Sequence, residues 1–176
     1  QMLIQQRKGW QTAAMVLGLA FAGHSLAQDT QDSITGYWRT IDDRTGFAKG
    51  IVRVDKKPDG TYSGTVVKAI PRPGYTPQEF CVNCPAPYTG KRIVGITHLT
   101  GLKPVADNDH AYEGGKIMDP LSGKVYSCKA RLSADGRRLS MRGYVGVSML
   151  GRSQSWIRET DPKMLEGIEG YRATER

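Results

Sequence analysis

Apolar and polar side chains alternate along several segments between residues 36 and 159. In the segment Lys124–Ser133 the polar side chains fall on one face and the apolar ones on the other, namely Tyr126, Cys128, Ala130 and Leu132. The segment Arg137–Val147 repeats the pattern, and its apolar face carries Leu139, Met141, Gly143, Val145 and Val147. A period of two is typical of a half-buried β-strand, so we expect these two faces to line a core.

Clusters of Asp, Asn, Pro and Gly, the residues that turn geometry favours, separate the alternating segments. Eight strands are predicted between these clusters, at Gly36–Ile41, Phe47–Asp55, Thr61–Ile70, Arg92–Thr100, His110–Met118, Lys124–Ser133, Arg137–Val147 and Ser153–Glu159. Helical periodicity is absent before residue 161. The tail Asp161–Arg176 is expected to hold at most one short helix, with Asp161 as its cap and Pro162 in its first turn.

Eight consecutive strands with one apolar face predict an all-β fold, an eight-stranded antiparallel up-and-down barrel. Closure of the sheet is favoured because it removes the unpaired strand edges. A sandwich of two sheets is the alternative. The sequence contains no internal repeat and no second-domain boundary, so residues 28–176 are expected to form a single domain.

Residues 1–27 have a different pattern, which is that of a secretory signal peptide. Arg7 and Lys8 precede an apolar run at 13–22, and a small-x-small motif ends at Ala27. The run has about half of the roughly 20 residues that a membrane-spanning helix needs. We therefore expect cleavage after Ala27 and a periplasmic or secreted protein that does not span the membrane.

The charge of the chain narrows its expected partners. The 25 Lys and Arg exceed the 17 Asp and Glu by eight, and removal of residues 1–27 leaves 149 residues with a net charge of +6. A mean hydropathy of −0.45 excludes a polytopic membrane protein. Export argues against nucleic acid as a partner, which leaves an anionic surface or an envelope protein as the expected partner of a basic chain.

The connection at residues 71–91 is long for a compact domain, and it holds five of the nine prolines together with Cys81 and Cys84. Such a loop is usually functional or mobile, and this one could cover one mouth of the barrel. Outside the cytoplasm a Cys81–Cys84 disulfide is the preferred pairing of the three possible ones, and it would leave Cys128 as a buried apolar residue on the inward face.

Two other roles for the cysteine pair stay open at this stage. A thiol-redox site would use Cys81 and Cys84, although the pair does not stand at a helix N-terminus that would lower a thiol pKa. A metal site would add His98 or His110 to the pair, but two cysteines without a second paired spacing are a weak zinc signal. No metal and no cofactor is predicted.

The sequence offers no clear catalytic arrangement. His98 and His110 stand in no nucleophile motif, and the chain has no Gly-x-Ser-x-Gly. Glu113 and Asp119 flank a Gly pair and could act as paired acids, but Asp119 is expected to close an Asp-Pro turn and Glu113 to be solvated. No helix follows the glycines at 114–115, so they do not form a phosphate cradle. We therefore expect a protein without enzymatic activity.

The first and last predicted strands carry a pair that can close the barrel. Gly36-Tyr37-Trp38 opens the first strand and Arg158 lies on the last, so the guanidinium can cover the Trp38 indole in a cation–π contact of about 0.5–2 kcal/mol. This arrangement resembles the Gly-x-Trp signature and the late Arg of the lipocalin or calycin superfamily. That resemblance implies an eight-stranded barrel that can hold a small apolar ligand.

A closer resemblance spans nearly the whole chain after residue 27. Motifs at 34–43, 81–84, 114–120 and 142–156 stand in the order and spacing of a bacterial family of exported proteins, the domain-of-unknown-function family 2147. This resemblance implies a lipocalin-like barrel in the cell envelope. It implies no particular activity and no catalytic residues.

The leading functional hypothesis is a protein that binds a small apolar or amphiphilic ligand, either inside the barrel or at the Pro-rich loop. The expected inward-facing ligand contacts are Tyr62, Val66, Tyr126, Leu132, Met141, Val145 and Val147. An interaction module for an envelope protein, with a filled barrel, is the alternative, and the thiol-redox protein is the second alternative. A cavity of roughly 300 Å³ favours a ligand, whereas an exposed apolar patch beside the cysteine loop favours a larger partner.

Overall fold

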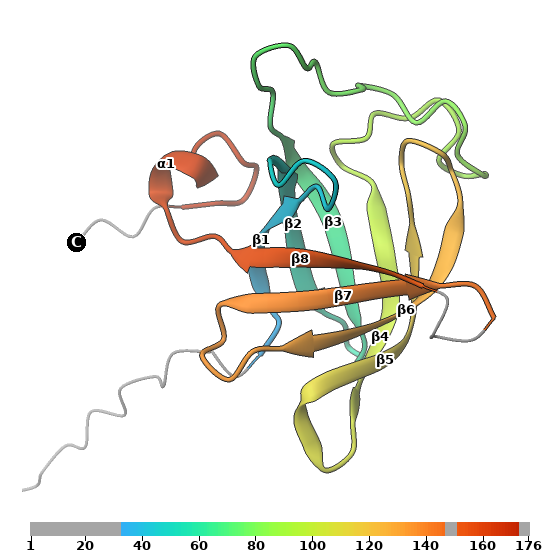
Figure 1. The fold of residues 1–176 in the computed structure, drawn as a ribbon, viewed down its shortest axis with the longest axis vertical. Helices are drawn as coiled ribbons and strands as arrows, with labels where there is room; N and C mark the ends of the chain where they lie inside the picture. Colours follow the sequence, from blue (N-terminus) through green and yellow to red (C-terminus); the bar gives the residue numbers. More distant parts are fainter. Residues whose placement is uncertain (1–32, 147–150, 173–176) are drawn as a thin grey trace, which may run out of the picture.

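The computed structural model describes residues 33–146 and 151–172, which form a closed barrel of eight antiparallel strands in chain order (Figure 1). The strands are β1 (Gly36–Ile41), β2 (Ala48–Lys56), β3 (Tyr62–Ala69), β4 (Thr97–Val105), β5 (Asn108–Met118), β6 (Val125–Leu132), β7 (Arg138–Tyr144) and β8 (Arg152–Arg158). Closure comes from the pairing of β1 with β8, where Trp38 lies opposite Arg158. The predicted barrel is therefore confirmed and the sandwich is excluded. The proposed signal peptide at 1–27 lies outside the described residues.

The largest error in the predicted strands concerns β4, which begins five residues later than expected and continues to Val105. Residues just before it bend instead, and the Ile96 amide donates to the carbonyl of Ile93. The strand tolerates Pro104 because the pairing of β3 with β4 ends at Tyr62 and Leu102. A proline amide carries no hydrogen, so it fits where a strand has no partner on that side.

One hydrophobic core fills the barrel, and every strand contributes to it. Its buried members on the strands are Trp38, Val52, Val54, Tyr62, Leu99, Leu102, Tyr112, Cys128, Ala130, Leu132, Leu139, Met141 and Trp156. The packing depends on Gly115, where a Cβ atom would stand 2.8 Å from the Cys128 sulfur and 2.9 Å from the Leu102 side chain. In the same core the Tyr62 ring from β3 and the Tyr112 ring from β5 meet edge to face, with their centroids 5.4 Å apart.

Trp38 and Arg158 seal one end of the barrel, which we call the closed end. The Arg158 guanidinium lies 4.3 Å from the centroid of the Trp38 ring and donates to the carbonyls of Ser33, Thr35 and Gly136 over 2.7–2.9 Å. The Trp38 indole nitrogen donates to the Ile34 carbonyl at 2.8 Å. The pair therefore fastens the segment before β1 across the barrel, in addition to the cation–π contact itself.

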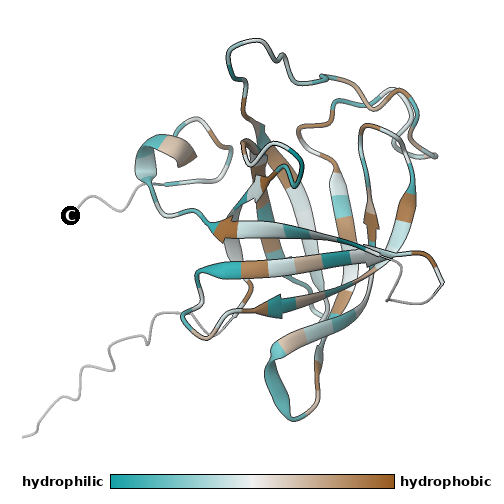
Figure 2. Ribbon diagram, in the orientation of Figure 1, coloured by the Kyte–Doolittle hydropathy of each residue, from teal (hydrophilic) through white to brown (hydrophobic). Residues whose placement is uncertain are grey.

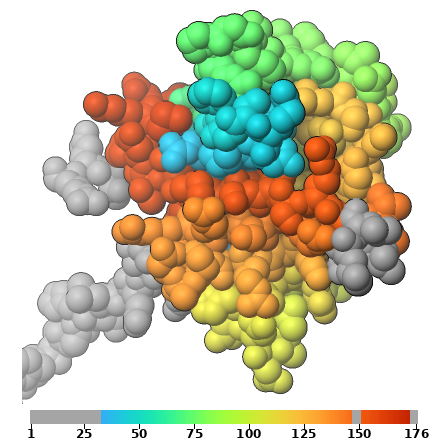
Figure 3. All heavy atoms as spheres, in the orientation of Figure 1, coloured from blue at the N-terminus to red at the C-terminus, as the bar shows by residue number. Residues whose placement is uncertain are grey.

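The other end of the barrel, which we call the disulfide end, carries the connections β1–β2, β3–β4, β5–β6 and the described part of β7–β8. The β3–β4 and β5–β6 connections lie together at the top of Figure 1. Arg72 joins two of the connections, because its guanidinium donates to the Thr45 hydroxyl at 3.3 Å. Figure 3 shows the β1–β2 connection, in cyan, in contact with the β3–β4 connection, in green.

The segment after β8 lies on the outside of the barrel as far as the structure describes it. Helix α1 (Pro162–Leu165) begins after Asp161, whose carboxylate accepts from the Lys163 amide at 2.9 Å, as the sequence predicts. Leu165 and Ile168 cover Ile51 on the outer face of β2, and this contact forms a separate apolar cluster. In the described residues no helix is long and apolar enough to cross a membrane.

Candidate binding surface at the disulfide end

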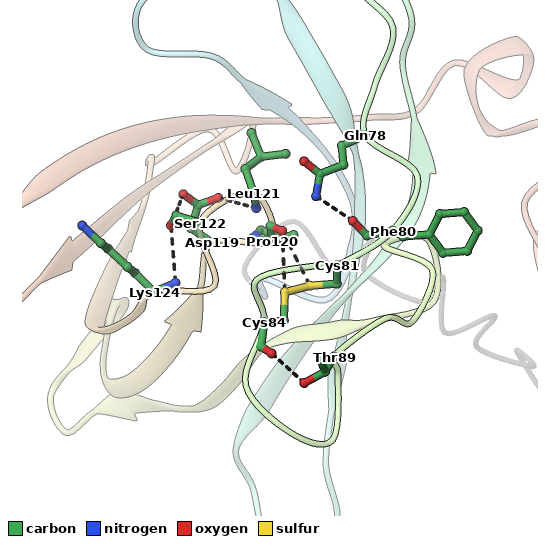
Figure 4. The surroundings of a disulfide bond; sticks show 10 residues. All are labelled: Gln78, Phe80, Cys81, Cys84, Thr89, Asp119, Pro120, Leu121, Ser122 and Lys124. Carbon is green, nitrogen blue, oxygen red and sulfur yellow. Dashed lines mark hydrogen bonds between the residues drawn. A yellow bond between two sulfur atoms is a disulfide. The ribbon is translucent and has the colours of Figure 1, made fainter.

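Cys81 and Cys84 form a disulfide that closes a small loop within the β3–β4 connection. The two residues are 0% and 4% exposed, and the carbonyl oxygen of Pro120 lies 3.6 Å from both sulfurs (Figure 4). These are van der Waals contacts, since a disulfide sulfur carries no hydrogen to donate. The Thr89 hydroxyl donates to the Cys84 carbonyl at 2.7 Å and holds the far side of the loop. Burial of both sulfurs does not favour the thiol-redox alternative, because exchange needs an accessible sulfur.

The turn between β5 and β6 is shaped to receive the cysteine loop. Asp119 accepts from the Leu121 amide at 3.0 Å and from the Ser122 hydroxyl at 2.8 Å. Gly123 has φ of 73°, and a Cβ atom there would stand 1.8 Å from the carbonyl oxygen of Asn83. Only glycine allows this approach of turn and loop. Asp119 therefore supports the turn, as expected, and Glu113 is exposed on β5.

A second apolar cluster lies beneath the cysteine loop. Its buried members are Cys81, Cys84, Ile93, Ile96 and Met118, and half-buried Val66 and Tyr88 pack against it. Val66 also contacts the main core of the barrel. The β3–β4 connection is therefore an ordered part of the fold that covers the ends of β3, β4 and β5.

Large apolar side chains are exposed around this end. They are Phe47, Tyr75, Phe80, Val82, Val94, Leu121, Val125 and Val145, and each lies on one of the four connections or within two residues of one. Figure 2 shows hydrophobic segments, in brown, along the loops at the upper right. In the described residues, no large apolar side chain is comparably exposed at the closed end.

Guanidinium groups cover the exposed aromatic rings. Arg72 lies 4.6 Å from the ring centroid of Phe47 and 4.9 Å from that of Tyr75. Arg92 lies 5.4 Å from the centroid of Phe80 and forms an ion pair with Glu79. The surface therefore combines apolar area with positive charge within a few ångströms.

A depression of about 300 Å³ lies at the base of the β3–β4 connection. Its walls are partly apolar and partly polar, and they are formed by Ala69, Pro71, Pro77, Gln78, Glu79, Arg92 and Val94. We call it the loop groove. A second depression of about 430 Å³ lies beside the β4–β5 hairpin, at the closed end of the barrel. It is lined by Pro104, Asp109, His110 and Tyr112.

Most of the predicted ligand contacts instead belong to the packed interior. Tyr62, Leu132 and Met141 are 6%, 2% and 1% exposed and are members of the main core. Val66 and Tyr126 are half-buried. Val66 packs against the main core, and the loop groove contains none of these five side chains.

The prediction that Val145 faces inward is wrong, because this side chain is 69% exposed. Strand β7 ends at Tyr144, so the alternation that the sequence extends to residue 147 stops one residue before Val145. Val147 lies outside the described residues.

His98 is a buried polar residue that sequence reasoning did not place in the core. Its ring lies 6.0 Å from that of Trp156, and burial lowers the pKa of the imidazole from 6.5 to about 4. A hydrogen bond to the Gly64 backbone opposes this shift, and Nδ1 has no partner among the described residues. The imidazole is therefore neutral at pH 7.

The third cysteine and the histidines do not form a reactive centre in the described part of the chain. Cys128 is a free, buried thiol on the inward face, and burial raises its pKa to about 12. It is therefore protonated and chemically inert under ordinary conditions. Nowhere in the described residues do three His, Cys, Asp or Glu side chains gather as a metal-binding group.

Eight antiparallel strands in chain order, closed by a Trp–Arg pair at one end, define the lipocalin-like class of barrels. Residues 36–158 match the profile of the family described as "uncharacterized protein conserved in bacteria", DUF2147, and the chain belongs to this family. The structure is also similar to that of HP1028, a Helicobacter pylori protein described as a member of the lipocalin family. The TM-score is 0.64 at 17% identity, over 80% of this chain and 93% of HP1028, which shows a shared fold. No curated protein matches the sequence.

Proposed function

We propose that the protein is an exported binding protein without enzymatic activity that takes a small amphiphilic molecule in the loop groove at the disulfide end. The observation that carries this proposal is the groove itself. Its volume of about 300 Å³ is at the lower end of the range for small-molecule sites. A mixture of apolar walls and a few polar groups is also typical of such sites.

The packed core supports a site outside the barrel axis. Side chains from all eight strands fill the interior, so a ligand bound there would have to displace several of them. Displacement of well-packed side chains costs free energy that a small molecule must supply from its own contacts. In this proposal the barrel is the scaffold and the β3–β4 connection is the binding element.

The lining of the groove suggests which parts of a ligand go where. Pro71, Pro77 and Val94 offer apolar surface to a hydrocarbon or aromatic body. The two prolines have fixed φ angles, so little conformational freedom is lost when the groove is occupied. Arg92 can pair with an anionic head group, since its guanidinium has five donors and shares only part of them with Glu79.

Binding can be tested with 1-anilinonaphthalene-8-sulfonate, a fluorescent amphiphile that has an anionic head and aromatic rings. The expected result is saturable binding to the folded protein, weakened about tenfold by Val94→Asp, which places a charge on the groove wall. Val125→Asp is the matched control, because Val125 is 51% exposed against 45% for Val94 and lies outside the groove. Absence of saturable binding, or equal weakening by both substitutions, would refute the proposal.

Processing of the N-terminus is a separate part of the proposal. The basic pair at Arg7 and Lys8, the apolar run and the motif ending at Ala27 support export and cleavage. The oxidised state of Cys81 and Cys84 in the structure is compatible with an oxidising compartment.

A further inference from the structure

The two ends of the barrel differ sharply in their surfaces. The eight exposed large apolar side chains named above all lie at the disulfide end. At the closed end the connections expose charged and polar turn residues such as Lys57, Asp135 and Arg137. Since single exposed apolar residues are normal but a grouping on one end is not, the grouping needs an explanation.

Basic side chains accompany the exposed apolar ones at the disulfide end. Four basic side chains of the connections have no carboxylate within ion-pair distance among the described residues, namely Arg44, Arg72, Lys91 and Lys124.

The acidic side chains nearby are engaged locally. Asp42 and Asp119 accept hydrogen bonds within their own turns, whereas Asp43 and Glu79 are paired with arginines. Asp42 and Asp119 keep their negative charge, but in the described residues neither forms an ion pair with the four basic side chains named above.

We propose that the disulfide end is a membrane-contacting face, which docks on the surface of a bilayer that contains anionic lipid. Exposed Phe, Tyr and Val side chains enter the interfacial region, and the surrounding Arg and Lys side chains pair with lipid head groups. This contact goes beyond the proposed ligand binding, because it assigns the protein a surface on which to work. The loop groove lies on the docking face, so an amphiphile can pass between the groove and the bilayer without crossing open water.

The arrangement fits a bilayer better than a protein partner for two reasons. Lysine is depleted in protein–protein interfaces, whereas here exposed Lys91 and Lys124 stand on the connections that also carry Phe80 and Leu121. The apolar side chains also come from four separate connections, each of which supplies only a few. A soft interface accommodates such scattered contacts, whereas a rigid protein surface needs matched shape.

Vesicle flotation tests the proposal with residues 28–176, because the apolar run at 13–22 would itself bind lipid. Wild-type protein is expected to float with vesicles of phosphatidylcholine that contain about 30% phosphatidylglycerol and much less with phosphatidylcholine alone. Each basic side chain near an anionic surface strengthens binding about fivefold. The double substitution Arg44→Gln with Lys91→Gln should therefore weaken binding about 25-fold.

The matched control is Lys57→Gln with Arg137→Gln, which removes the same charge at the closed end. Because that end lies well beyond the screening length of roughly 10 Å at 0.1 M salt, this variant should bind like wild type. A third variant, Phe80→Ser with Val82→Ser, leaves the charge unchanged and is expected to bind at least fivefold more weakly.

Three results would overturn the membrane-contacting face. The first is failure of the wild type to float with anionic vesicles, which would leave a protein partner as the explanation of the surface. The second is equal weakening by the two charge variants, and the third is unchanged flotation of the Phe80 and Val82 variant. Binding of 1-anilinonaphthalene-8-sulfonate is measured without lipid, so the two proposals fail independently of each other.

Discussion

His98 should make the protein sensitive to acid in a pH range that a single substitution can identify. Its imidazole lies inside the barrel beside Trp156, and burial lowers its pKa from 6.5 to about 4. Lys49 and Asp119 act on the ring electrostatically from the disulfide end, in opposite directions. In the unfolded chain the same imidazole takes up a proton near pH 6.5.

This difference in pKa makes the folded protein less stable as the pH is lowered. Between about pH 6.5 and pH 4 the unfolded chain binds a proton that the folded protein does not, so the free energy of unfolding falls as the pH is lowered. The lowering of the pKa corresponds to about 3 kcal/mol, and below about pH 4 no further loss comes from this group. Such a loss is a large part of the 5–15 kcal/mol that typically stabilises a folded protein.

The assay is urea denaturation at pH 7, 5.5 and 4 for wild type and His98→Phe. Phenylalanine keeps a ring against Trp156 but cannot take up a proton, so the variant should lose most of the decline between pH 7 and pH 4. The quantity compared is the change of the free energy of unfolding with pH. The stability at pH 7 is not compared, because the substitution also removes the hydrogen bond to Gly64. If the free energy of unfolding of the variant declines with pH as steeply as that of wild type, His98 is not the group responsible.

Carboxylates provide an internal check on this experiment. Asp42, Asp59 and Asp135 have pKa values lowered below 3.8. Each carboxylate accepts a hydrogen bond from the backbone amide two residues further along the chain. The stability that they contribute is present above the ordinary pKa and is lost as the pH falls through the lowered one. Their effect should therefore appear below about pH 4 and be the same in both proteins.

Four further predictions concern packing, the disulfide, the closed end and export. Gly115→Ala should cost about 1–3 kcal/mol in urea denaturation, because its Cβ would meet Cys128 at 2.8 Å, whereas Gly143→Ala meets its nearest atom at 3.4 Å and should cost less. Replacement of Cys81 and Cys84 by Ser should lower thermal stability and weaken dye binding, while circular dichroism still shows the barrel. Arg158→Lys should cost about 2 kcal/mol in the same denaturation, since one ammonium cannot serve three carbonyls in place of a planar guanidinium. Mass spectrometry of the exported protein should give the mass of residues 28–176, and an unprocessed chain would contradict the signal peptide.

The strands were predictable where alternation is regular and turns are marked by Gly, Asp or Pro. Strand β1 was predicted to the residue, and the inward position of Cys128 follows directly from the period of two. Val145 was misplaced because a strand ends where its hydrogen-bonded partner ends, which the alternation of one segment does not reveal.

His98 was missed for a different physical reason. The register of β3 against β4 shifts between Gly64 and Thr65, so that Leu99 and Thr97 lie opposite consecutive residues and His98 is the extra residue of a bulge. A bulge interrupts the period of two, which allows His98 and Leu99 to be buried side by side. Bulges arise from pairing between strands, and the sequence of one strand does not show them.

The loop groove was foreseen only in outline. Prolines and the cysteine pair mark residues 71–91 as a special connection, but the groove also needs Ala69 and Val94, which lie outside that range. Its shape depends on how the connection folds onto the β5–β6 turn, through contacts such as that between Gly123 and Asn83. Contacts between segments about 40 residues apart are not encoded in any local pattern.

The proposed ligand site is the loop groove and not the interior of the barrel. The most direct measurement is the change in backbone amide NMR shifts when 1-anilinonaphthalene-8-sulfonate is titrated into the protein. The largest shifts should occur at Gln78, Glu79 and Val94, with little change at the core residues Leu132 and Met141. Largest shifts at Leu132 and Met141 would place the ligand inside the barrel and rule out the loop groove as its site.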